Sequence, residues 1–464
     1  MWDVHAIQLI ITNACNFKCE YCYECYEDKR MDWKTAKQTI DFLANTPGNH
    51  SINVNFFGGE PLLYWELIED LVCYGEKKDR KFTFGITTNT SLINRDILRF
   101  MRRHNMSLLN SIDGVKEAQK YRVPKKGDFD KVFDDIIKNS KMALEMGLGH
   151  TGRMTVIPET IEYMFDSIVF LNEEVGFPMV FAVPAVSGHD TTFTENDWKR
   201  VQEEIDKLTQ WFIDKIKKGK RIQFNYCDSL IEYKMGLKSY KPHFSCGIGK
   251  GFFGVGVDGN IYPCQRLVGT DEIKMGDVFS GMNKKGYELN ELFNNTIPKR
   301  DFSECIGCEN TMCEGACVAV SYERYGSFST PCSDECRYQK MLYRGVLEVY
   351  ETLKNTDYLN KVYRVNKGNK KPRKTWNFNQ PNWENNQNNQ NNQNKRNNKS
   401  DCSNDFLKNL KIDDLNNNER IVIQKNPDGK PLVIKIPKDM DLSGDIDLRK
   451  SPKGKPTLIV EEKK

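Results

Sequence analysis

Short apolar runs alternate with longer amphipathic segments from His5 to about Lys217. In the longer segments, for example residues 33–44 and 195–216, apolar residues recur at steps of three and four, as on the inward side of a helix. Repeated β-then-α units predict a parallel sheet with crossover helices, curled into an open or closed barrel. The six predicted strands begin at His5, Ser51, Lys81, Ser107, His150 and Met179.

The segment from about residue 223 to residue 350 departs from this pattern. It is rich in cysteine and glycine, and its strand signals are short, with Asp258-Gly259 typical of a hairpin turn. A helical pattern over residues 333–353 closes it. We therefore expect a second, smaller domain.

The composition changes again after residue 366. Residues 367–400 are rich in Asn, Gln and Lys, so they bury too little apolar surface to fold alone. Beyond them, Ile421 begins two apolar runs around an Asn-Pro-Asp-Gly turn, which predicts a small β-hairpin at most. The predicted organisation is a core over residues 1–222, a cysteine-rich domain over 223–355, a linker over 367–400 and a mostly disordered tail over 401–464.

Composition narrows the class of protein. Of the 464 residues, 39% are hydrophobic and 28% are charged, as in soluble globular proteins, and the net charge of +4 gives no electrostatic case for nucleic acid. No apolar run approaches the ~18 residues of a membrane span, and the N-terminus has no signal-peptide pattern. We therefore expect a cytoplasmic protein without membrane or nucleic-acid partners. In that reducing compartment, the fifteen cysteines indicate metal or cluster binding rather than disulfides.

Most of the cysteines fall into two sets. Cys15, Cys19 and Cys22 follow the first predicted strand, at the edge of a parallel sheet where ligands bind. A four-iron cubane takes four thiolates, so a set of three leaves one iron open for a substrate or cofactor. Zinc is the alternative for the second set, whose Cys-x2-Cys and Cys-x3-Cys spacings resemble a zinc ribbon. That second set comprises Cys246, Cys264, Cys305, Cys308, Cys313, Cys317, Cys332 and Cys336.

Cys15-x3-Cys19-x2-Cys22, with the aromatic Tyr21 before the third cysteine, resembles the signature of the radical S-adenosylmethionine (radical SAM) superfamily. The resemblance implies a [4Fe–4S] cluster on these cysteines, whose open iron chelates the amino and carboxylate groups of S-adenosylmethionine. One-electron cleavage of this cofactor yields a 5′-deoxyadenosyl radical, which abstracts a substrate hydrogen. We expect Cys25 to stay out of the ligand set, because it would close the iron that this chemistry needs open.

Residues at later strand ends extend the resemblance. The Gly-Gly-Glu-Pro at residues 58–61 resembles the family's GGE motif, whose glycines permit a close backbone approach and whose acid meets the methionine ammonium. A strand-end cap or turn is the alternative for Asn89 and Asp113, and an ion pair is the alternative for Arg153. No catalytic residue is expected beyond the cluster. The cofactor-binding candidates are Tyr21, Gly58, Gly59, Glu60, Pro61, Thr88, Asn89, Ser111, Asp113 and Arg153.

The second cysteine set resembles the SPASM domain, which holds auxiliary clusters in some radical SAM enzymes. Cys246 precedes a Gly-x4-Cys at Gly259 and Cys264, and the later run is one residue shorter than usual between Cys308 and Cys313. The resemblance implies one cluster on Cys305, Cys308, Cys313 and Cys336. A second cluster would take Cys246, Cys264 and Cys317, with a fourth ligand that is Cys332 or missing. Of the remaining cysteines, Cys73 is predicted to be a small buried hydrophobe, Cys227 could supply the missing ligand, and Cys402 has no partner at a useful spacing.

SPASM enzymes mostly modify peptides or proteins. In sulfatase maturases the residue after the Gly-x4-Cys cysteine is typically an Asp that acts as base, whereas Gln265 follows Cys264 here and cannot accept a proton at neutral pH. We therefore expect a maturase of a ribosomally made, cysteine-containing peptide, which forms thioether crosslinks because auxiliary clusters can bind or re-oxidise a substrate thiolate. The alternatives are a formylglycine-forming sulfatase maturase or another SPASM protein-modifying enzyme and, more remotely, a zinc-ribbon binding module or an electron carrier.

The resemblance also implies a fold and partners. The expected fold is a partial (β/α)6 barrel of the radical SAM type, followed by a small SPASM domain and the tail. The expected partners are the precursor peptide and a reductant such as flavodoxin or ferredoxin. Because the chain enters its first strand at His5, we expect leader-peptide recognition by a separate protein, by the barrel or by the tail.

Overall fold

The structure is a computed structural model, and contacts divide the chain into two units, Met1–Asn388 and Asn389–Lys464. In the first unit the described residues are 3–24, 27–186, 192–225, 227–238, 246–295, 304–310, 313 and 315–364. In the second unit only the backbone of four strands is described. The predicted linker over residues 367–400 lies outside the described residues.

A largely parallel sheet forms the centre of the first unit, as predicted. Its six main strands lie in chain order and are joined by parallel pairing, and a short seventh strand, β9 (Gln223–Phe224), extends the series beyond the last of them. Each strand forms at one of the six apolar runs that predicted it, so the predicted fold class is confirmed. They are β1 (Ala6–Thr12), β3 (Ile52–Gly58), β4 (Phe82–Thr88), β5 (Ser107–Ser111), β7 (Thr151–Val156) and β8 (Met179–Pro184).

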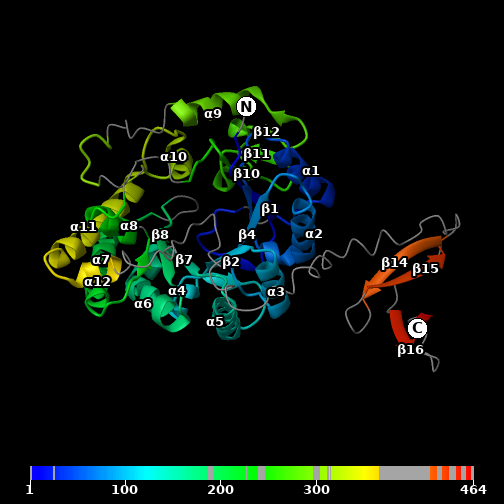
Figure 1. Cartoon of the computed structure of the whole chain (residues 1–464), viewed down its shortest axis with the longest axis horizontal. Coiled ribbons are helices and arrows are strands. Elements are labelled where there is room, and N and C mark those ends of the chain that lie inside the picture. Colours follow the sequence, from blue (N-terminus) through cyan, green and yellow to red (C-terminus); the bar gives the residue numbers. More distant parts are fainter. Residues whose placement is uncertain are drawn as a thin grey trace. The chain divides into compact units, whose positions relative to one another are not determined.

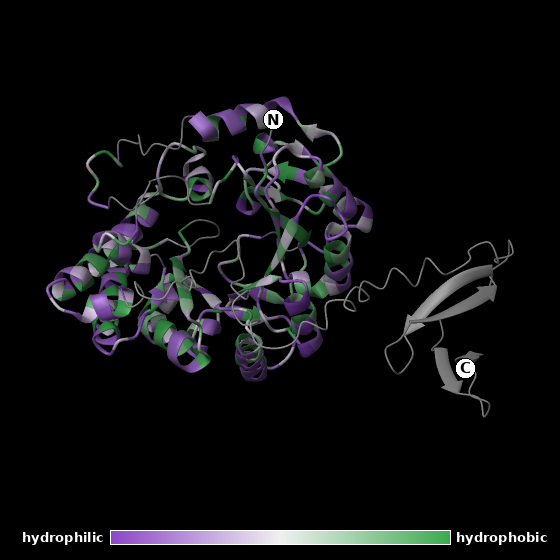
Figure 2. Cartoon of the chain, viewed as in Figure 1, coloured by the Kyte–Doolittle hydropathy of each residue, from purple (hydrophilic) through white to green (hydrophobic). Residues whose placement is uncertain are grey.

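Helices cover the outer side of these strands (Figure 1). Side-chain caps fix several of their starts: Asp32 accepts from the Thr35 N–H at 2.7 Å, and Thr194 and Asp197 form a capping box. The helices of the β-then-α units are α1 (Trp33–Ala44), α2 (Trp65–Gly75), α3 (Arg95–Arg103), α5 (Phe129–Glu145), α6 (Met164–Val169), which runs into a π-helical turn (Phe170–Val175), and α7 (Glu195–Lys217). Figure 2 shows apolar residues along the strands and polar residues on the outward helix faces.

The cysteine-rich segment adds strands to the same sheet. β10 (Phe252–Val255) pairs in parallel with β1, and β11 (Asn260–Tyr262), β12 (Gly276–Asp277) and β13 (Gly281–Met282) follow in antiparallel order. The predicted turn joins β10 to β11, where Gly259 has a φ of +83° and the Asp258 carboxylate accepts from the Asn260 N–H at 3.0 Å. The sheet therefore has eleven strands, with β13 and β9 at its edges. The domain boundary at residue 222 stays a prediction.

Long helices of the second half pack on the first half. Tyr338 on α11 donates its hydroxyl to Ala182 O on β8 at 2.8 Å, and Gly345 lies where a Cβ would be 2.6 Å from Thr209 Oγ1 on α7. The helices here are α8 (Cys227–Lys234), α9 (Lys284–Asn295), α10 (Val318–Tyr325), α11 (Ser333–Leu353) and α12 (Tyr358–Tyr363). No helix among the described residues is long and apolar enough to cross a membrane.

Buried apolar side chains form two clusters. One surrounds β1 and β3 and includes Leu9, Ile40 and Phe56; the other lies between α7 and α11 and includes Trp198 and Tyr338. Short elements complete the first unit: β2 (Phe17–Cys19), α4 (Lys116–Gln119), β6 (Arg122–Pro124) and 3-10 turns at Pro61–Tyr64, Pro158–Tyr163, Gln265–Leu267 and Asp271–Ile273.

The second unit holds two antiparallel strand pairs. β14 pairs with β15 around the predicted Asn-Pro-Asp-Gly turn, and β16 pairs with β17. Their bounds are Glu419–Lys425, Pro431–Pro437, Ile446–Lys450 and Pro456–Val460. The turn and the rest of the predicted tail lie outside the described residues.

Candidate functional site

The loop that follows β1 brings Cys15, Cys19 and Cys22 together. Cys19 ends β2, whose antiparallel pairing with β6 sets it opposite Arg122. The Cys22 N–H donates to Cys19 O at 3.2 Å, and the Phe17 N–H donates to Cys15 Sγ at 3.4 Å. All three thiols are half-buried, and each of Cys15 and Cys19 interacts electrostatically with Cys22. The predicted set of three is therefore one group in space.

The chemistry of this group fits an iron–sulfur cluster. Burial raises the pKa of Cys15 to about 11 and that of Cys19 to about 12, and at Cys19 the nearby Arg122 acts in the opposite direction. The metal-free thiols are therefore protonated at neutral pH and lose their protons as metal binds. The described residues of the loop contain no fourth cysteine, and Cys25 lies outside them. Three thiols suit a [4Fe–4S] cluster with one open iron.

Two glycines at the end of β3 let the cysteine loop lie against the strand. Gly58 has a φ of +127°, and a Cβ there would lie 2.1 Å from Thr12 O. A Cβ on Gly59 would lie 2.2 Å from Ala14 O. The Gly59 N–H donates to Thr12 O at 2.8 Å, and the Glu60 N–H donates to Ala14 O at 2.9 Å. Only glycine allows backbones to approach this closely, so the pair sets the position of the loop.

Glu60 is 1% exposed and joins the ends of β3 and β4. Its Oε1 accepts from the Leu62 N–H at 3.0 Å and from the Thr88 hydroxyl at 2.8 Å. Its Oε2 accepts from the Asn89 N–H at 2.8 Å. Burial raises the pKa of Glu60 to about 7, although these three donors favour the charged form. The carboxylate thus organises the two strand ends, and Pro61 begins the 3-10 turn that follows it.

Asn89 connects β4 to the cysteine loop. Its Nδ2 donates to Asn16 Oδ1 at 2.9 Å, and its Oδ1 accepts from the Ser91 hydroxyl at 2.6 Å and the Ser91 N–H at 3.1 Å. Asn16 Nδ2 donates in turn to Ser91 Oγ at 2.9 Å. Asn89 therefore forms the turn that was the alternative to a cofactor-binding role. The same contacts hold Asn16, the residue next to Cys15, in place.

Asp113 is the centre of a buried network after β5. Its two oxygens accept from Arg122 Nε and Nη2, both at 2.9 Å, and Oδ1 also accepts from the Thr155 N–H at 2.9 Å. The Tyr21 hydroxyl donates to Oδ2, and the Arg122 guanidinium lies 5.4 Å from the centre of the Tyr21 ring. Asp113 therefore orients Tyr21 and Arg122 beside the cysteines, while Ser111, its neighbour at the end of β5, is half-buried.

Arg153 on β7 belongs to a second polar group. It lies opposite Ser111 in the sheet register, and its side chain is exposed. Its strongest electrostatic neighbours are tyrosines and arginines, Tyr23 and Arg266 among them, and no carboxylate. Arg266 packs 4.4 Å from the centre of the Tyr23 ring and forms a two-pronged ion pair with Glu323 at 2.8 Å. The ion-pair alternative for Arg153 therefore finds no carboxylate among these strongest neighbours.

Two groups of cysteines lie in the second half of the chain. Cys264 interacts electrostatically with Cys317 and Cys246, and burial raises the pKa of Cys317 to about 12. This grouping matches the three cysteines that the SPASM resemblance assigns to one cluster. They come from three separate segments, which the sheet extension and the start of α10 bring together.

The other group gathers near the start of α11. Burial raises the pKa of Cys336 to about 12, with further contributions from Cys313 and Cys305. The Cys308 N–H donates to Cys305 O at 3.2 Å, which places Cys308 on the same turn. Cys332 differs, because it is fully buried in the apolar cluster between α7 and α11, and its electrostatic neighbours are acids.

Glu335 lies near both cysteine groups. Its Oε2 accepts from the Cys317 N–H at 2.8 Å, and it interacts electrostatically with Cys332 and Cys336. Burial raises its pKa, although Arg266 and the Cys317 N–H favour the charged form. A half-buried acid near both cysteine groups was not expected from the sequence.

Two remaining cysteines lie apart from these groups. Cys73 is half-buried, so its prediction as a small buried hydrophobe is wrong. The reason is the helix phase: the buried positions of α2 are Ile68, Leu71, Val72 and Gly75. Cys73 is also disulfide-bonded, which differs from the general expectation that the cysteines bind metal or clusters. Cys227 is buried and lines an apolar cavity between α7 and α11. Cys402 lies outside the described residues.

Comparison with known proteins identifies the first part of the chain. Residues 9–171 match the family described as the Radical SAM superfamily. The chain contains a radical SAM domain. Members of this superfamily use a [4Fe–4S] cluster and S-adenosylmethionine, the two cofactors that the cysteine loop predicts.

Similar proteins extend this relationship beyond the domain. The chain is 22% identical over 377 residues to the radical SAM cyclopropyl synthase TigE of Paramaledivibacter caminithermalis, covering 75% of this chain and 74% of that protein. It is 25% identical over 338 residues to a cysteine-type anaerobic sulfatase-maturating enzyme of Clostridium novyi, covering 66% and 85%. The chain is thus related to these radical SAM enzymes over most of its length.

Solved structures share its fold. The radical SAM chain superimposes on anSMEcpe with bound AdoMet with a TM-score of 0.62 at 18% identity, covering 77% of this chain and 98% of that one. It superimposes on Streptococcus suis SuiB bound to the precursor peptide SuiA with a TM-score of 0.50 at 16% identity, covering 72% and 76%.

Three residues of the site have no recognisable signal of their role in the sequence. Arg122 lies on a strand of three residues, which is too short to show a period, and only its pairing with β2 brings it to Cys19. Tyr23 and Glu335 carry no motif of their own. The one available signal for Glu335 was an acid in the first turn of α11, which also suits the helix dipole.

Proposed function

We propose that this radical SAM enzyme is a maturase that oxidatively modifies a ribosomally made peptide, forming thioether crosslinks from its cysteines. The observation that carries the proposal is the presence of three cysteine groups, one in the loop after β1, one at the sheet extension and one near the start of α11. Cys15, Cys19 and Cys22 would hold the radical-generating cluster. Bound there, the cluster and S-adenosylmethionine supply a 5′-deoxyadenosyl radical that takes one hydrogen atom from the substrate.

The residues around the first cluster would position the cofactor. Gly58 and Gly59 hold the cysteine loop against β3, which fixes where the open iron would lie. Glu60, with its partners Thr88 and Asn89, keeps the ends of β3 and β4 together on the same side. Polar groups of these strand ends are the ones we assign to the methionine part of the cofactor.

Further candidates line the later strands. Ser111 and Arg153 are neighbours in the sheet register, and the exposed Arg153 guanidinium has no carboxylate among its strongest neighbours. We assign this pair to the cofactor or to an anionic part of the substrate. Asp113 acts through Tyr21 and Arg122, because both of its oxygens are already occupied by protein donors.

The second-half cysteines would hold two auxiliary clusters. Electrostatic grouping supports one cluster on Cys305, Cys313 and Cys336, to which the turn with Cys305 adds Cys308, and another on Cys246, Cys264 and Cys317. The burial of Cys332 among apolar side chains supports a second cluster without it. An open position on that cluster would suit a substrate thiolate, which favours a cysteine-containing peptide. A zinc-ribbon module or an electron carrier would require no radical SAM domain.

Formylglycine formation is the second candidate, supported by the similarity to a sulfatase-maturating enzyme. The residue after Cys264 argues against it. Gln265 begins a 3-10 turn, its Oε1 is buried with no hydrogen-bond partner among the described residues, and an amide cannot take up a substrate proton at neutral pH. The thioether proposal needs no strong base at this position if the substrate thiol is deprotonated by binding to iron.

The mass of the product distinguishes the two reactions. We would incubate the anaerobically reconstituted enzyme with S-adenosylmethionine, a flavodoxin or ferredoxin reductant, and a cysteine-containing precursor peptide encoded by a neighbouring reading frame. A separate leader-binding protein would be added if such a gene is adjacent. Thioether formation removes two hydrogens, retains sulfur and protects that cysteine from alkylation. Loss of sulfur with gain of an aldehyde would support formylglycine formation and contradict the proposal.

A further inference from the structure

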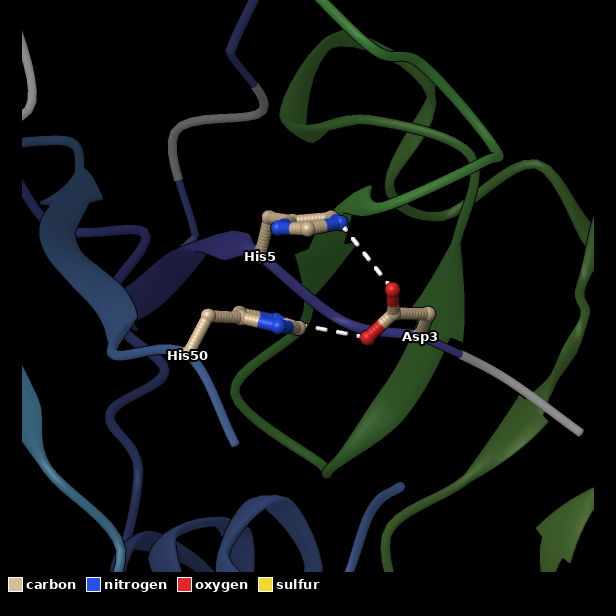
Figure 3. A group of neighbouring side chains, drawn as sticks. All are labelled: Asp3, His5 and His50. Atoms are coloured by element: carbon tan, nitrogen blue, oxygen red, sulfur yellow. Dashed lines mark ion pairs between the residues drawn. The ribbon is translucent and has the colours of Figure 1, made fainter. Parts of the chain in front are cut away.

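Three side chains with metal-binding groups meet at the start of β1, at the opposite end of the strand from the cysteine loop. An Asp3 carboxylate oxygen lies 3.3 Å from His5 Nε2, and the other lies 3.4 Å from His50 Nε2 (Figure 3). The two imidazole rings stack with their centres 3.9 Å apart and their planes 18° apart. One ligand atom from each residue lies within 4.8 Å of the other two. Each oxygen of the Asp3 carboxylate thus faces one ring nitrogen.

The separations suit a small divalent cation. Zinc binds imidazole nitrogen and carboxylate oxygen at about 2.0–2.2 Å, so tetrahedral ligand atoms lie about 3.3–3.5 Å from one another. The two nitrogen–oxygen distances have this length, each to a different oxygen of Asp3. Because the imidazole rings are stacked, they must turn for both nitrogens to face one cation. We propose that Asp3, His5 and His50 bind one divalent cation of the zinc class, with a fourth position left for water.

Two glycines leave room for these side chains. Gly48 has a φ of +97°, and a Cβ there would lie 2.7 Å from Asp3 Oδ1 and 2.9 Å from His50 Cε1. A Cβ on Gly251 would lie 2.4 Å from His5 Cδ2. Any larger residue at either position would push a ligand out of place. The convergence therefore depends on the backbone on two sides, as well as on the three side chains.

The site joins three parts of the sheet. Asp3 and His5 precede β1, His50 precedes β3, and the His5 N–H donates to the carbonyl of Gly251 at the start of β10 at 2.8 Å. β10 opens the sheet extension of the cysteine-rich segment. A bound cation would thus hold the start of β1 to the start of β3, and the backbone hydrogen bond of His5 joins the same point to the segment that enters β10. The cation would stabilise the junction between the two halves of the enzyme, far along β1 from the cysteine loop.

Two neighbouring groups compete with the cation. His50 Nε2 lies 2.9 Å from Val4 O, so this nitrogen carries a proton in the metal-free protein that the cation must replace. Arg80 Nη2 lies 3.5 Å from the same nitrogen, and its positive charge repels a cation. Removal of the Arg80 charge should therefore strengthen binding. If the three residues formed only two His–Asp ion pairs and no metal site, removal of the Arg80 charge would not change zinc binding.

Zinc retention by the full-length enzyme with its clusters assembled tests the site. The protein is equilibrated with Zn²⁺, desalted and analysed for zinc and iron. We expect wild type to retain one more equivalent of zinc than His5→Ala, His50→Ala or Asp3→Asn, at equal iron. His104→Ala is the matched control, because His104 lies 3.0 Å from the Glu76 carboxylate and belongs to no group of three such ligands among the described residues. It should retain the wild-type amount.

Affinity provides a second readout. In competition with a chromogenic chelator, each ligand variant should bind Zn²⁺ at least ~10-fold more weakly than wild type, the smallest loss seen even for outer partners of a metal site. Arg80→Gln should bind it more tightly. Equal zinc in wild type and the two histidine variants would overturn the proposal, as would an Arg80→Gln variant that binds no more tightly. Asp3→Asn keeps the size of an exposed side chain, so its folding is not in question.

Discussion

Gly59→Ala is a sharp test of how the cysteine loop is positioned. Gly59 does not have a positive φ, so alanine fits the backbone conformation, and only the added methyl group matters. Its carbon would lie 2.2 Å from Ala14 O and 2.5 Å from Ala14 C, both backbone atoms next to Cys15. The loop must therefore retreat by about 1 Å, roughly twice the ~0.5 Å within which a reactive site has to be held.

The expected loss follows from that displacement. A shift of ~1 Å at a reacting centre costs about 100-fold in rate, and overpacking of this kind costs about 1–3 kcal/mol in the free energy of unfolding. The assay is the rate of 5′-deoxyadenosine formation with reductant and S-adenosylmethionine, with iron content and chemical unfolding measured on the same sample. We expect a folded enzyme with about 100-fold lower activity, through poorer cluster loading or a misplaced cluster.

Gly256→Ala is the matched control. It also lacks a positive φ, and a Cβ there would meet movable side-chain atoms, Asp258 Oδ1 at 2.9 Å and Val268 Cγ1 at 3.2 Å. These can rotate away, so the control should keep near wild-type activity. If Gly59→Ala retained activity within about twofold of the control, the account of the glycine pair would be refuted.

Three further predictions concern buried groups. Arg122→Gln should lower the free energy of unfolding by about 3–5 kcal/mol in urea melts, because it leaves the buried Asp113 carboxylate without its cation; an effect below 1 kcal/mol would contradict this. Burial raises the pKa of Glu60 to about 7 from an ordinary ~4.3. The protonated side chain therefore stabilises the fold fully below about pH 4.3, and this contribution of about 3–4 kcal/mol is lost as the pH rises to about 7. Glu60→Gln should remove this slope, measured by chemical unfolding between about pH 5 and pH 8, whereas parallel profiles would show that another group titrates. Cys332→Ser should keep the wild-type iron content while Cys336→Ser loses iron, and equal losses would place Cys332 among the ligands.

The sequence allowed the main sheet to be predicted because its signals are local. Each of the six parallel strands has its own apolar run, and α1 begins and ends where the three- and four-residue spacing does, at Trp33 and Ala44. The cysteine spacing and the GGE motif are also local, so the members of the first group could be named in advance. The positions of the cysteines and of the GGE motif at strand ends then implied that these residues lie close together and are partly buried.

Other features depend on contacts between distant segments. The parallel pairing of β10 with β1 joins Phe252 to Ala6, and nothing in either run indicates that partner. The same holds for Cys19 opposite Arg122 and for His50 beside Asp3. The sequence could suggest that Asp113 matters but could not show that its oxygens are already used by protein donors. Such roles depend on the folded neighbours rather than on residue type.

The most direct test of the central claim is the cleavage of S-adenosylmethionine. The enzyme and its triple variant, with Cys15, Cys19 and Cys22 changed to Ala, are reconstituted anaerobically with iron and sulfide, and 5′-deoxyadenosine is measured after reductant and cofactor are added. The account predicts product from wild type and none from the variant, which should retain the iron of the auxiliary clusters. No product from wild type, or undiminished product from the variant, would contradict it.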